Sequence, residues 1–181
     1  MEVSTGKIVL VGMPGSGKTT LGRDIAQRLG FRFYDLDHLI ESKAGERIST
    51  IFSEKGEGYF REMESAVLLS CLKKNESFVL STGGGAPCFN GNMEVINKYA
   101  LSIYLEVPLS QLLSRLTGGQ VQKRPLFYGL EPGEIISKLR SMYELRHPFY
   151  EMAKITLSGE DISAELLIGE WMAMLKGKPE G

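Results

Sequence analysis

The chain has 181 residues, which is about the size of one ordinary domain. Its composition, 43% hydrophobic and 24% charged, is typical of a globular protein that can bury a core. The formal net charge of -1 argues against a large nucleic-acid-binding surface, although it is compatible with a local basic pocket for an anionic small molecule. We therefore expect a single domain, covering residues 1–181, that binds no nucleic acid.

Targeting signals are missing from the sequence pattern. The N-terminal residues lack the basic and apolar regions of a signal peptide, and no apolar run approaches the roughly 18 residues needed to cross a bilayer. Cys71 and Cys88 have no metal-ligand spacing relative to His38 or His147, so reduced thiols are the simplest interpretation. We expect a cytoplasmic protein with no membrane partner.

Short apolar runs alternate with helical patterns along the whole chain, which predicts a parallel sheet covered by helices on both faces. Helices are expected over Lys18–Leu29, over Leu109–Thr117, from Pro132 or Gly133 towards Arg146, and over Ile162–Leu175. The strands are expected at Lys7–Val11, Phe31–Asp35, Phe78–Ser81, Leu101–Glu106 and Ile155–Leu157. The fold class is therefore α/β.

Two segments interrupt this alternation. A longer helical excursion runs from Asp37 to Lys74, broken at Gly45 and again around Gly56. Such an insertion, about 36–75, is expected to build a substrate pocket rather than core. A polar and basic segment bounded by glycines, about 118–130, is expected to be a mobile lid.

The stretch Gly12–Thr19 reads Gly-Met-Pro-Gly-Ser-Gly-Lys-Thr and matches G-x-x-x-x-G-K-[ST], the phosphate-binding P-loop. It follows the first predicted strand and opens the first predicted helix, whose N-terminus favours anions. Lys18 is expected to reach the β- and γ-phosphates, and the Thr19 hydroxyl to hold a magnesium ion. The alternative is a glycine-rich turn before an ordinary helix. The expected nucleotide contacts are Gly12, Pro14, Gly15, Ser16, Gly17, Lys18, Thr19 and Thr20.

Two carboxylates stand one residue apart at the end of the second strand, where open α/β sheets bind their ligands. Asp35 is expected to face the magnesium ion through its waters, and Asp37 an acceptor hydroxyl. The alternative is that Asp37 only caps a helix over Asp37–Ala44. The pattern favours the functional interpretation, because the strand has no other reason to end in two acids.

Three glycines, Gly83–Gly85, follow the third strand, where many P-loop enzymes place an acid that supports magnesium. They let backbone N–H groups approach a ligand closely, so an anionic or hydroxylated acceptor is expected between them and the P-loop. A plain flexible turn is the alternative. Since no acid stands here, the support for magnesium beyond Thr19 is expected from Asp35.

Three arginines, Arg61, Arg124 and Arg146, lie in the later motifs. A guanidinium binds a carboxylate or phosphate through a planar fork, so two converging arginines would suit a carboxylated substrate. Each could instead be a solvated surface charge, and Arg61 could pair with Glu64 at i,i+3.

These motifs, in this order and spacing, resemble the shikimate kinase family. The resemblance runs from about Lys7 to Ala153. It implies a P-loop kinase of the nucleoside-monophosphate-kinase type, a three-layer αβα domain with strand order 2-3-1-4-5, and transfer of the ATP γ-phosphate to the 3-hydroxyl of shikimate in aromatic amino acid (chorismate) biosynthesis. We also expect a monomer. Magnesium would assist. The matching motifs are Gly12–Thr19, Asp35-Leu36-Asp37, Phe60-Arg61 with Glu64, Gly83-Gly84-Gly85-Ala86, Arg124-Pro125-Leu126 and Arg146 through Tyr150.

The resemblance also implies roles for single residues. Arg61 and Arg146 would hold the shikimate carboxylate, and Asp37 would orient or deprotonate the attacking hydroxyl. Lys18 and the lid residue Arg124 would stabilise charge on the transferring phosphoryl group and contact ATP. Arg115 would stack on adenine. The shikimate-binding set implied in this way is Asp37, Arg61, Gly83, Gly84, Gly85 and Arg146, with Phe52 and Phe60 lining the pocket.

One departure and two rival functions remain at this point. The segment Ser158–Asp161 lacks the proline often seen near the second adenine contact of the family. The rivals are a related small-molecule kinase, such as one acting on gluconate, and a non-catalytic ATP-binding module.

Overall fold

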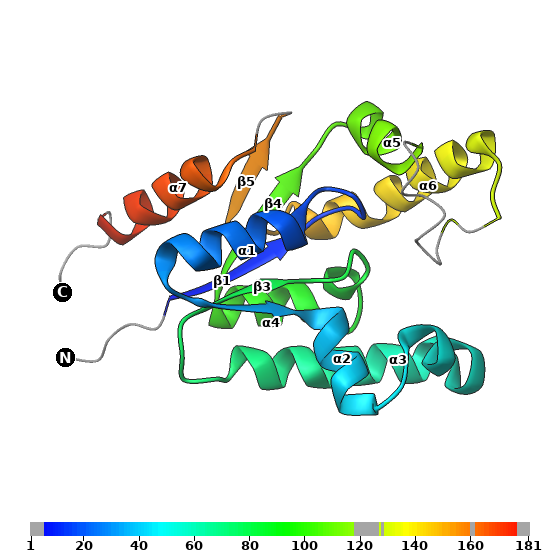
Figure 1. Ribbon diagram of the computed structural model, residues 1–181, viewed down its shortest axis with the longest axis horizontal. Helices are drawn as coiled ribbons and strands as arrows, with labels where there is room; N and C mark the ends of the chain where they lie inside the picture. The colour runs from blue at the N-terminus through cyan, green and yellow to red at the C-terminus, as the bar shows by residue number, and fades with distance from the viewer. Residues whose placement is uncertain (1–5, 118–126, 128, 160–161, 177–181) are drawn as a thin grey trace.

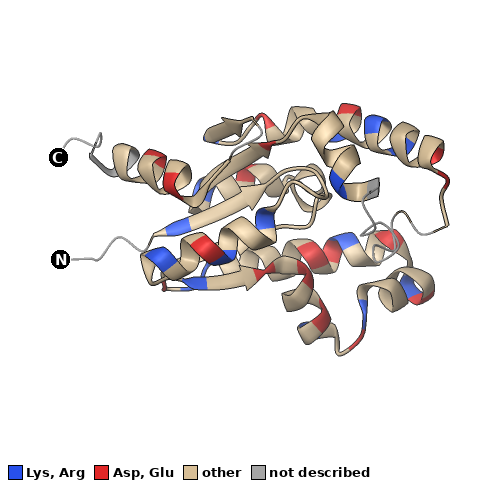
Figure 2. Cartoon of the chain, turned by 45° about the horizontal axis from the view of Figure 1, so that its top comes forward, with Lys and Arg blue, Asp and Glu red and all other residues tan. Residues whose placement is uncertain are grey.

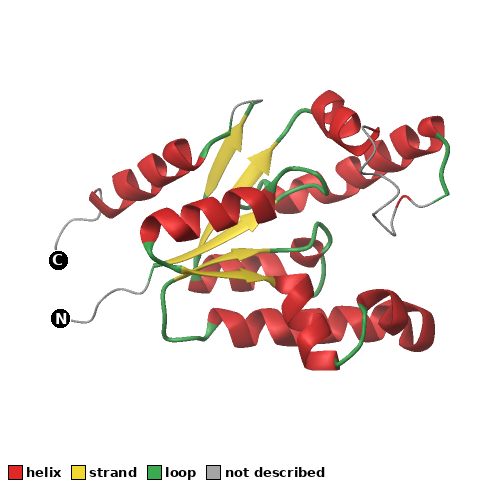
Figure 3. Cartoon of the chain, in the orientation of Figure 1, coloured by secondary structure: helices red, strands yellow, loops and turns green. Residues whose placement is uncertain are grey.

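The computed structural model describes residues 6–117, 127, 129–159 and 162–176 (Figure 1). Figure 3 shows how strands and helices alternate along these residues. In chain order the elements are β1 (Lys7–Val11), α1 (Lys18–Leu29), β2 (Arg32–Asp35), α2 (Leu36–Ala44), α3 (Ile48–Leu72), β3 (Phe78–Ser81), the 3₁₀-helix η1 (Ala86–Cys88), α4 (Asn92–Tyr99), β4 (Leu101–Glu106), α5 (Leu109–Thr117), α6 (Pro132–Tyr150), β5 (Ile155–Ser158) and α7 (Ala164–Lys176).

The strands form one five-stranded sheet in the order β2-β3-β1-β4-β5, with every neighbouring pair parallel. This confirms the predicted fold class and strand order. The central strand β1 is buried on both faces, which is why it reads as a continuous apolar run rather than an alternating one. Because all strands run the same way, their carboxyl ends meet at one edge, and the loops that follow β1, β2 and β3 come together there.

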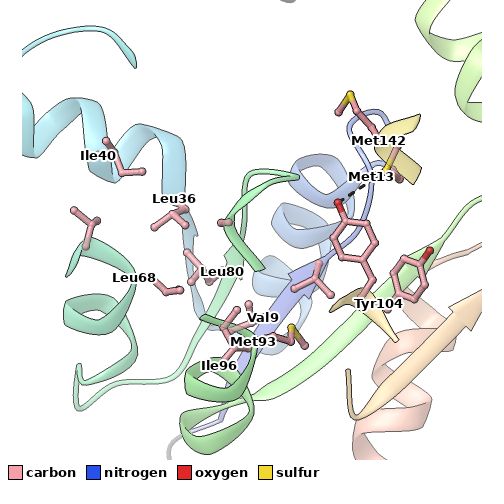
Figure 4. Packing of buried hydrophobic residues seen from close by; sticks show 14 of the residues in the cluster. Val9, Met13, Leu36, Ile40, Leu68, Leu80, Met93, Ile96, Tyr104 and Met142 are labelled. Atoms are coloured by element: carbon pink, nitrogen blue, oxygen red, sulfur yellow. Dashed lines mark hydrogen bonds between the residues drawn. The ribbon is translucent and has the colours of Figure 1, made fainter. Parts of the chain in front are cut away.

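Alternate side chains of the sheet enter two separate cores. Ile8 and Leu10 pack with Ile25 of α1 and Leu167 of α7 on one face. Val9 and Val11 pack on the other face against residues of the remaining helices. Figure 4 shows part of this second core, where Val9 and Leu80 of the sheet lie among Leu36, Leu68, Met93, Ile96 and Tyr104. The result is the expected three-layer arrangement.

Several elements differ from the sequence-based expectation. The 3₁₀-helix η1 and helix α4 had no predicted counterpart, because both are short and glycines and Pro87 surround them. Helix α6 continues one turn beyond Arg146 to the fully buried Tyr150, although Pro148 lies inside it. The burial of Tyr150 outweighs the one backbone hydrogen bond that proline cannot make.

The segment predicted as a substrate-binding insertion folds as α2 and α3. Helix α2 and the first part of α3 lie beyond the carboxyl edge of the sheet, at the lower right of Figure 1, and the rest of α3 runs back beneath the sheet. There Val67, Leu68 and Leu72 join the core, so the expectation that the insertion builds a pocket rather than core is wrong for this part. Helix α3 changes direction at Gly56, whose φ of 82° and ψ of 170° are not helical. The predicted lid, about 118–130, lies almost entirely outside the described residues, and Arg124 is among those outside.

Charged residues of both signs are interspersed along the helices in Figure 2. Within the described residues, no helix is both long and apolar enough to span a bilayer.

Candidate active site

The P-loop occupies the turn between β1 and α1, as its motif predicts. Gly17 adopts a φ of 92°, a left-handed conformation that glycine takes without steric cost, and it forms the N-cap of α1. The buried Lys18 Nζ donates hydrogen bonds to the carbonyl oxygens of Gly12 at 2.8 Å and Met13 at 2.9 Å. The Lys18 ammonium group is therefore held by backbone carbonyl oxygens of the P-loop, close to where a bound phosphate is expected.

Thr19, Asp35 and Ser81 form an oxygen cluster beside the P-loop. The Thr19 Oγ1 donates to Asp35 Oδ2 at 3.1 Å and lies 3.2 Å from Ser81 Oγ. Magnesium prefers hard oxygen ligands and is usually held by only one or two protein groups, with water completing its shell. A hydroxyl and a carboxylate at this distance fit such an ion, whereas the described residues contain no cluster of three or more His, Cys, Asp or Glu that could hold a metal.

Asp35 is also the N-cap of α2. Its Oδ1 accepts hydrogen bonds from the backbone N–H groups of Asp37 at 3.1 Å and His38 at 3.4 Å. The alternative considered for Asp37, that it merely caps this helix, is therefore wrong, since the cap lies two residues earlier and the helix starts at Leu36. The Asp37 carboxylate remains directed at the glycine turn.

Gly83–Gly85 are packed against three of the predicted acceptor-binding side chains. A methyl group added at Gly83 would lie 2.9 Å from Asp37 Oδ1. At Gly84 it would lie 3.1 Å from Arg146 Nη1, and at Gly85 2.9 Å from Arg61 Nη2. A side chain at Gly83 or Gly85 would therefore displace Asp37 or Arg61. One at Gly84 would first meet Pro14 of the P-loop, at 2.9 Å. The structure thus brings an acid and two arginines together around a bare backbone turn, at the edge where the P-loop also lies.

Arg61 is held firmly within this group. Its side chain is 13% exposed, its Nη1 donates to Glu64 Oε2 at 2.7 Å, and its guanidinium carbon lies 4.0 Å from the centroid of the Phe89 ring. The i,i+3 pair with Glu64 considered from the sequence is present, and it coexists with the approach to Gly85. Phe52 and Phe60, the predicted apolar lining, pack against each other with ring centroids 4.5 Å apart.

The surroundings change the acidity of two carboxyl groups here. Although Asp37 is an exposed residue, the protein around its carboxyl partly desolvates it and raises its pKa, and the nearby Asp35 charge adds to the rise. Lys18 and Arg61 oppose this shift. Burial also raises the pKa of Glu64, against the attraction of Arg61.

Helix α6 supplies Arg146 and, one turn later, Tyr150. The Tyr150 hydroxyl donates to the Gly84 carbonyl oxygen at 2.5 Å. Between them His147 is half-buried, with Nδ1 3.3 Å from the Tyr104 hydroxyl and its ring stacked on Tyr143 at 4.8 Å between centroids. Helix α6 turns this face towards β4, so His147 packs against Tyr104 and Tyr143.

A cavity of about 600 Å³ opens on the other side of the P-loop. Arg115 of α5 borders it and donates from Nη1 to the Gly15 carbonyl oxygen at 3.2 Å. Ile162–Glu165 form the opposite wall of the cavity. They directly follow Ser158–Asp161, the segment that lacks the proline often seen in the family. Thr20, exposed on α1, also lines the cavity. Its size and position suit a nucleoside attached to a phosphate in the loop.

A protein-family model described as "Shikimate kinase" matches residues 14–176. The chain belongs to the shikimate kinase family. It is similar to a shikimate kinase of Parabacteroides distasonis, with 39% identity over 88% of this chain and 91% of the relative. It is also similar to one of Neisseria meningitidis serogroup C, with 44% identity over 83% and 85%.

Solved structures of this family share the fold. The crystal structure of shikimate kinase from Bacteroides thetaiotaomicron has a TM-score of 0.85 and 36% identity, covering 94% of this chain and 98% of that one. The shikimate kinase of Acinetobacter baumannii, solved in complex with shikimate, has a TM-score of 0.82 and 34% identity, covering 98% and 97%.

For this member of the shikimate kinase family, some residues at the site had no role predicted from the sequence. Ser81 is an ordinary strand residue in the sequence, and only the register of β1 and β2 with β3 places it next to Thr19. Tyr150 ends the motif that starts at Arg146, but the sequence does not indicate its partner Gly84, which lies 66 residues away. Arg124 lies outside the described residues, so its predicted role stays a prediction.

Proposed function

We infer that this protein is a shikimate kinase, which transfers the γ-phosphate of ATP to the 3-hydroxyl of shikimate and yields shikimate 3-phosphate and ADP. The observation that carries this inference is the convergence of Asp37, Arg61 and Arg146 on Gly83–Gly85, beside the P-loop. A small acceptor with one carboxylate and several hydroxyls matches two guanidinium groups, one acid and exposed backbone.

We propose that Arg61 and Arg146 bind the acceptor carboxylate. Both guanidinium groups lie against the glycine turn, where backbone N–H groups can add further hydrogen bonds. Phe52 and Phe60 supply the apolar wall against the carbon ring, since their own rings pack together at the same end of α3. This division of polar and apolar contacts is typical of small-molecule sites.

On the donor side, the P-loop backbone from Gly12 to Thr19 binds the phosphates, and the cavity bordered by Arg115 takes the nucleoside. Thr19, with Asp35 acting through water and Ser81 beside it, is the proposed holder of magnesium. When bound, Mg²⁺ neutralises phosphate charge as transfer proceeds.

Asp37 is the proposed group that orients or deprotonates the attacking hydroxyl. A carboxyl whose pKa is raised accepts a proton more readily than an ordinary aspartate, and partial desolvation together with the Asp35 charge supplies that shift. Lys18 has to exchange the carbonyl oxygens of Gly12 and Met13 for phosphate oxygens. It can then stabilise the charge on the transferring phosphoryl group, as Arg124 is proposed to do from the other side.

The decisive experiment measures ADP release from ATP and Mg²⁺ with and without shikimate. A strong dependence on shikimate supports the proposal, whereas release only with gluconate, or only without any acceptor, contradicts it. The Lys18→Ala variant, prepared in the same way, controls for contaminating kinases, because it should lose turnover by about two to four orders of magnitude. Sedimentation analysis of the same sample tests the proposed monomer.

A further inference from the structure

The guanidinium of Arg61 is engaged by a second carboxylate, that of Glu57, besides Glu64. Glu57 Oε1 accepts from Arg61 Nε at 3.2 Å and from Nη2 at 3.1 Å. These two N–H groups form one of the two edges at which a guanidinium can hold a carboxylate with two parallel hydrogen bonds. Glu64 engages Nη1, which belongs to the other edge. Both edges of the proposed carboxylate-binding arginine thus contact a carboxylate of the protein itself.

Two aromatic rings lie near the same guanidinium. Its carbon lies 4.0 Å from the Phe89 ring centroid and 5.1 Å from that of Phe60. Because the N–H bonds of a guanidinium point outward in its plane, a substrate carboxylate binds Arg61 along an edge, where it meets Glu57 or Glu64.

The two glutamates differ in how readily they can leave. The Glu64 side chain is 2% exposed, so its departure would strand a buried carboxyl without its partner. The Glu57 side chain is 58% exposed, and water can replace Arg61 around it at little cost. Glu57 also follows directly on Gly56, where α3 changes direction and where nothing lies within 4 Å of the space a side chain would fill. The side chain that can give way is therefore Glu57.

We propose that Glu57 competes with the acceptor carboxylate for the Nε and Nη2 edge of Arg61, so that acceptor binding requires Glu57 to be displaced. This inference rests on the proposed function. The competing group, like the anionic group of the acceptor, is a carboxylate. Glu57 thereby weakens acceptor binding and holds Arg61 in place while the site is empty.

The test compares Glu57→Gln with the wild type and with Glu54→Gln. Glu54 is an exposed acid of the same helix, and the structure gives it no ion pair with Arg61. We expect Glu57→Gln to lower the KM for shikimate about 1.5- to 5-fold, the range that loss of one exposed ion pair produces. The KM for ATP should stay unchanged, and Glu54→Gln should match the wild type.

A second comparison separates competition from a structural effect on α3. Lysine at position 61 keeps the positive charge but has no planar edge, so the benefit of Glu57→Gln should vanish in an Arg61→Lys background. Calorimetric binding of shikimate without ATP gives the same comparisons independently of turnover.

The outcomes are distinguishable. A raised or unchanged KM for shikimate in Glu57→Gln overturns the inference, the first by showing that Glu57 positions Arg61 for binding. An equal gain in Glu54→Gln, or a gain that persists with Arg61→Lys, also overturns it, because the effect would then be a general field or a change in the helix. A wild-type protein that neither binds nor phosphorylates shikimate refutes the proposed function itself, and the inference with it.

Discussion

The Tyr150 hydroxyl donates a 2.5 Å hydrogen bond to the carbonyl oxygen of Gly84. Tyr150 is fully buried and lies one helical turn after Arg146, so α6 presents both a cation and an anchor to the same glycine turn. Because a trans peptide unit is planar, holding the Gly84 carbonyl oxygen also directs the Gly85 N–H the opposite way. Tyr150 therefore positions backbone of the proposed acceptor site.

Tyr150→Phe should raise the KM for shikimate about two- to tenfold, the worth of one intramolecular hydrogen bond, and leave the KM for ATP unchanged. The phenyl ring preserves the packing, so the far-ultraviolet circular dichroism should not change. Steady-state kinetics with each substrate varied in turn would measure the split. Tyr143→Phe is the matched control, since Tyr143 is on the same helix and stacks on His147 instead. Parallel rises in both KM values, or the same loss in the control, would point to general loosening of α6.

The raised pKa of Asp37 predicts that activity falls at acid pH. Desolvation and the Asp35 charge raise its pKa in the folded protein. If its carboxylate assists the attacking hydroxyl, kcat/KM for shikimate should fall on the acid side, with an apparent pKa above that of an ordinary aspartate. A pH–rate profile at saturating ATP measures this value. An acid limb at the ordinary aspartate pKa would argue against the role.

The charged Asp37 carboxylate should support activity but lower the stability of the folded protein. The unfolded chain has the ordinary, lower pKa, so stability is greatest where Asp37 is protonated and falls as the pH rises through the raised pKa. At neutral pH, Asp37→Asn should therefore increase the Tm while lowering kcat by about 10²- to 10⁴-fold. Thermal unfolding at pH 7 tests the first part. A lower Tm in this variant would show that the carboxylate stabilises the free protein.

The layers and strand order of the fold follow from local patterns. Strands such as β1 and β3 are buried on both faces, and their continuous apolar runs identify them almost to the residue. Element ends depend on tertiary contacts and were less predictable. Pro148 suggests an end to α6, yet the burial of Tyr150 keeps the last turn helical.

The convergence of the predicted acceptor-binding residues could be expected from the sequence, whereas their individual contacts could not. The carboxyl-edge rule and the motifs bring Asp37, Arg61 and Arg146 to one edge of the sheet, and the structure places them around Gly83–Gly85. Which groups hold them in the absence of substrate is decided by register and packing. Aspartate is a preferred N-cap, so the cap of α2 has a sequence signal, but Asp35 and Asp37 carry it equally. The bond from Tyr150 to Gly84 leaves no signal in sequence spacing.

Arg115 allows the donor side to be tested separately. It borders the cavity beside the P-loop and bonds to the Gly15 carbonyl oxygen. Arg115→Ala should raise the KM for ATP about 2- to 30-fold, the range of a cation–π contact with a base, without affecting the KM for shikimate. Arg32→Ala removes the same charge at the opposite end of the sheet and should behave as the wild type. Equal KM values for ATP in all three proteins would remove Arg115 from the nucleotide site.

Asp35 has two functions that one substitution can separate. It caps α2 through the N–H groups of Asp37 and His38, and it accepts the Thr19 hydroxyl beside the proposed magnesium position. Asparagine caps helices as well as aspartate does but carries no charge. Asp35→Asn should therefore keep the Tm close to that of the wild type, and it should raise the Mg²⁺ concentration for half-maximal ADP release about 10- to 100-fold.

Asp35→Ala completes the comparison, because it removes the cap as well and should cost about 0.5–2 kcal/mol of unfolding free energy in addition. Ser81→Ala, which removes the other neighbour of Thr19 without changing charge, should shift the Mg²⁺ requirement much less. Magnesium titrations and thermal unfolding of the three variants decide the matter. If Asp35→Asn had a normal Mg²⁺ requirement while Asp35→Ala were merely less stable, Asp35 would serve only to start α2 and hold Thr19, and the support for the metal would have to come from Thr19 and the nucleotide alone.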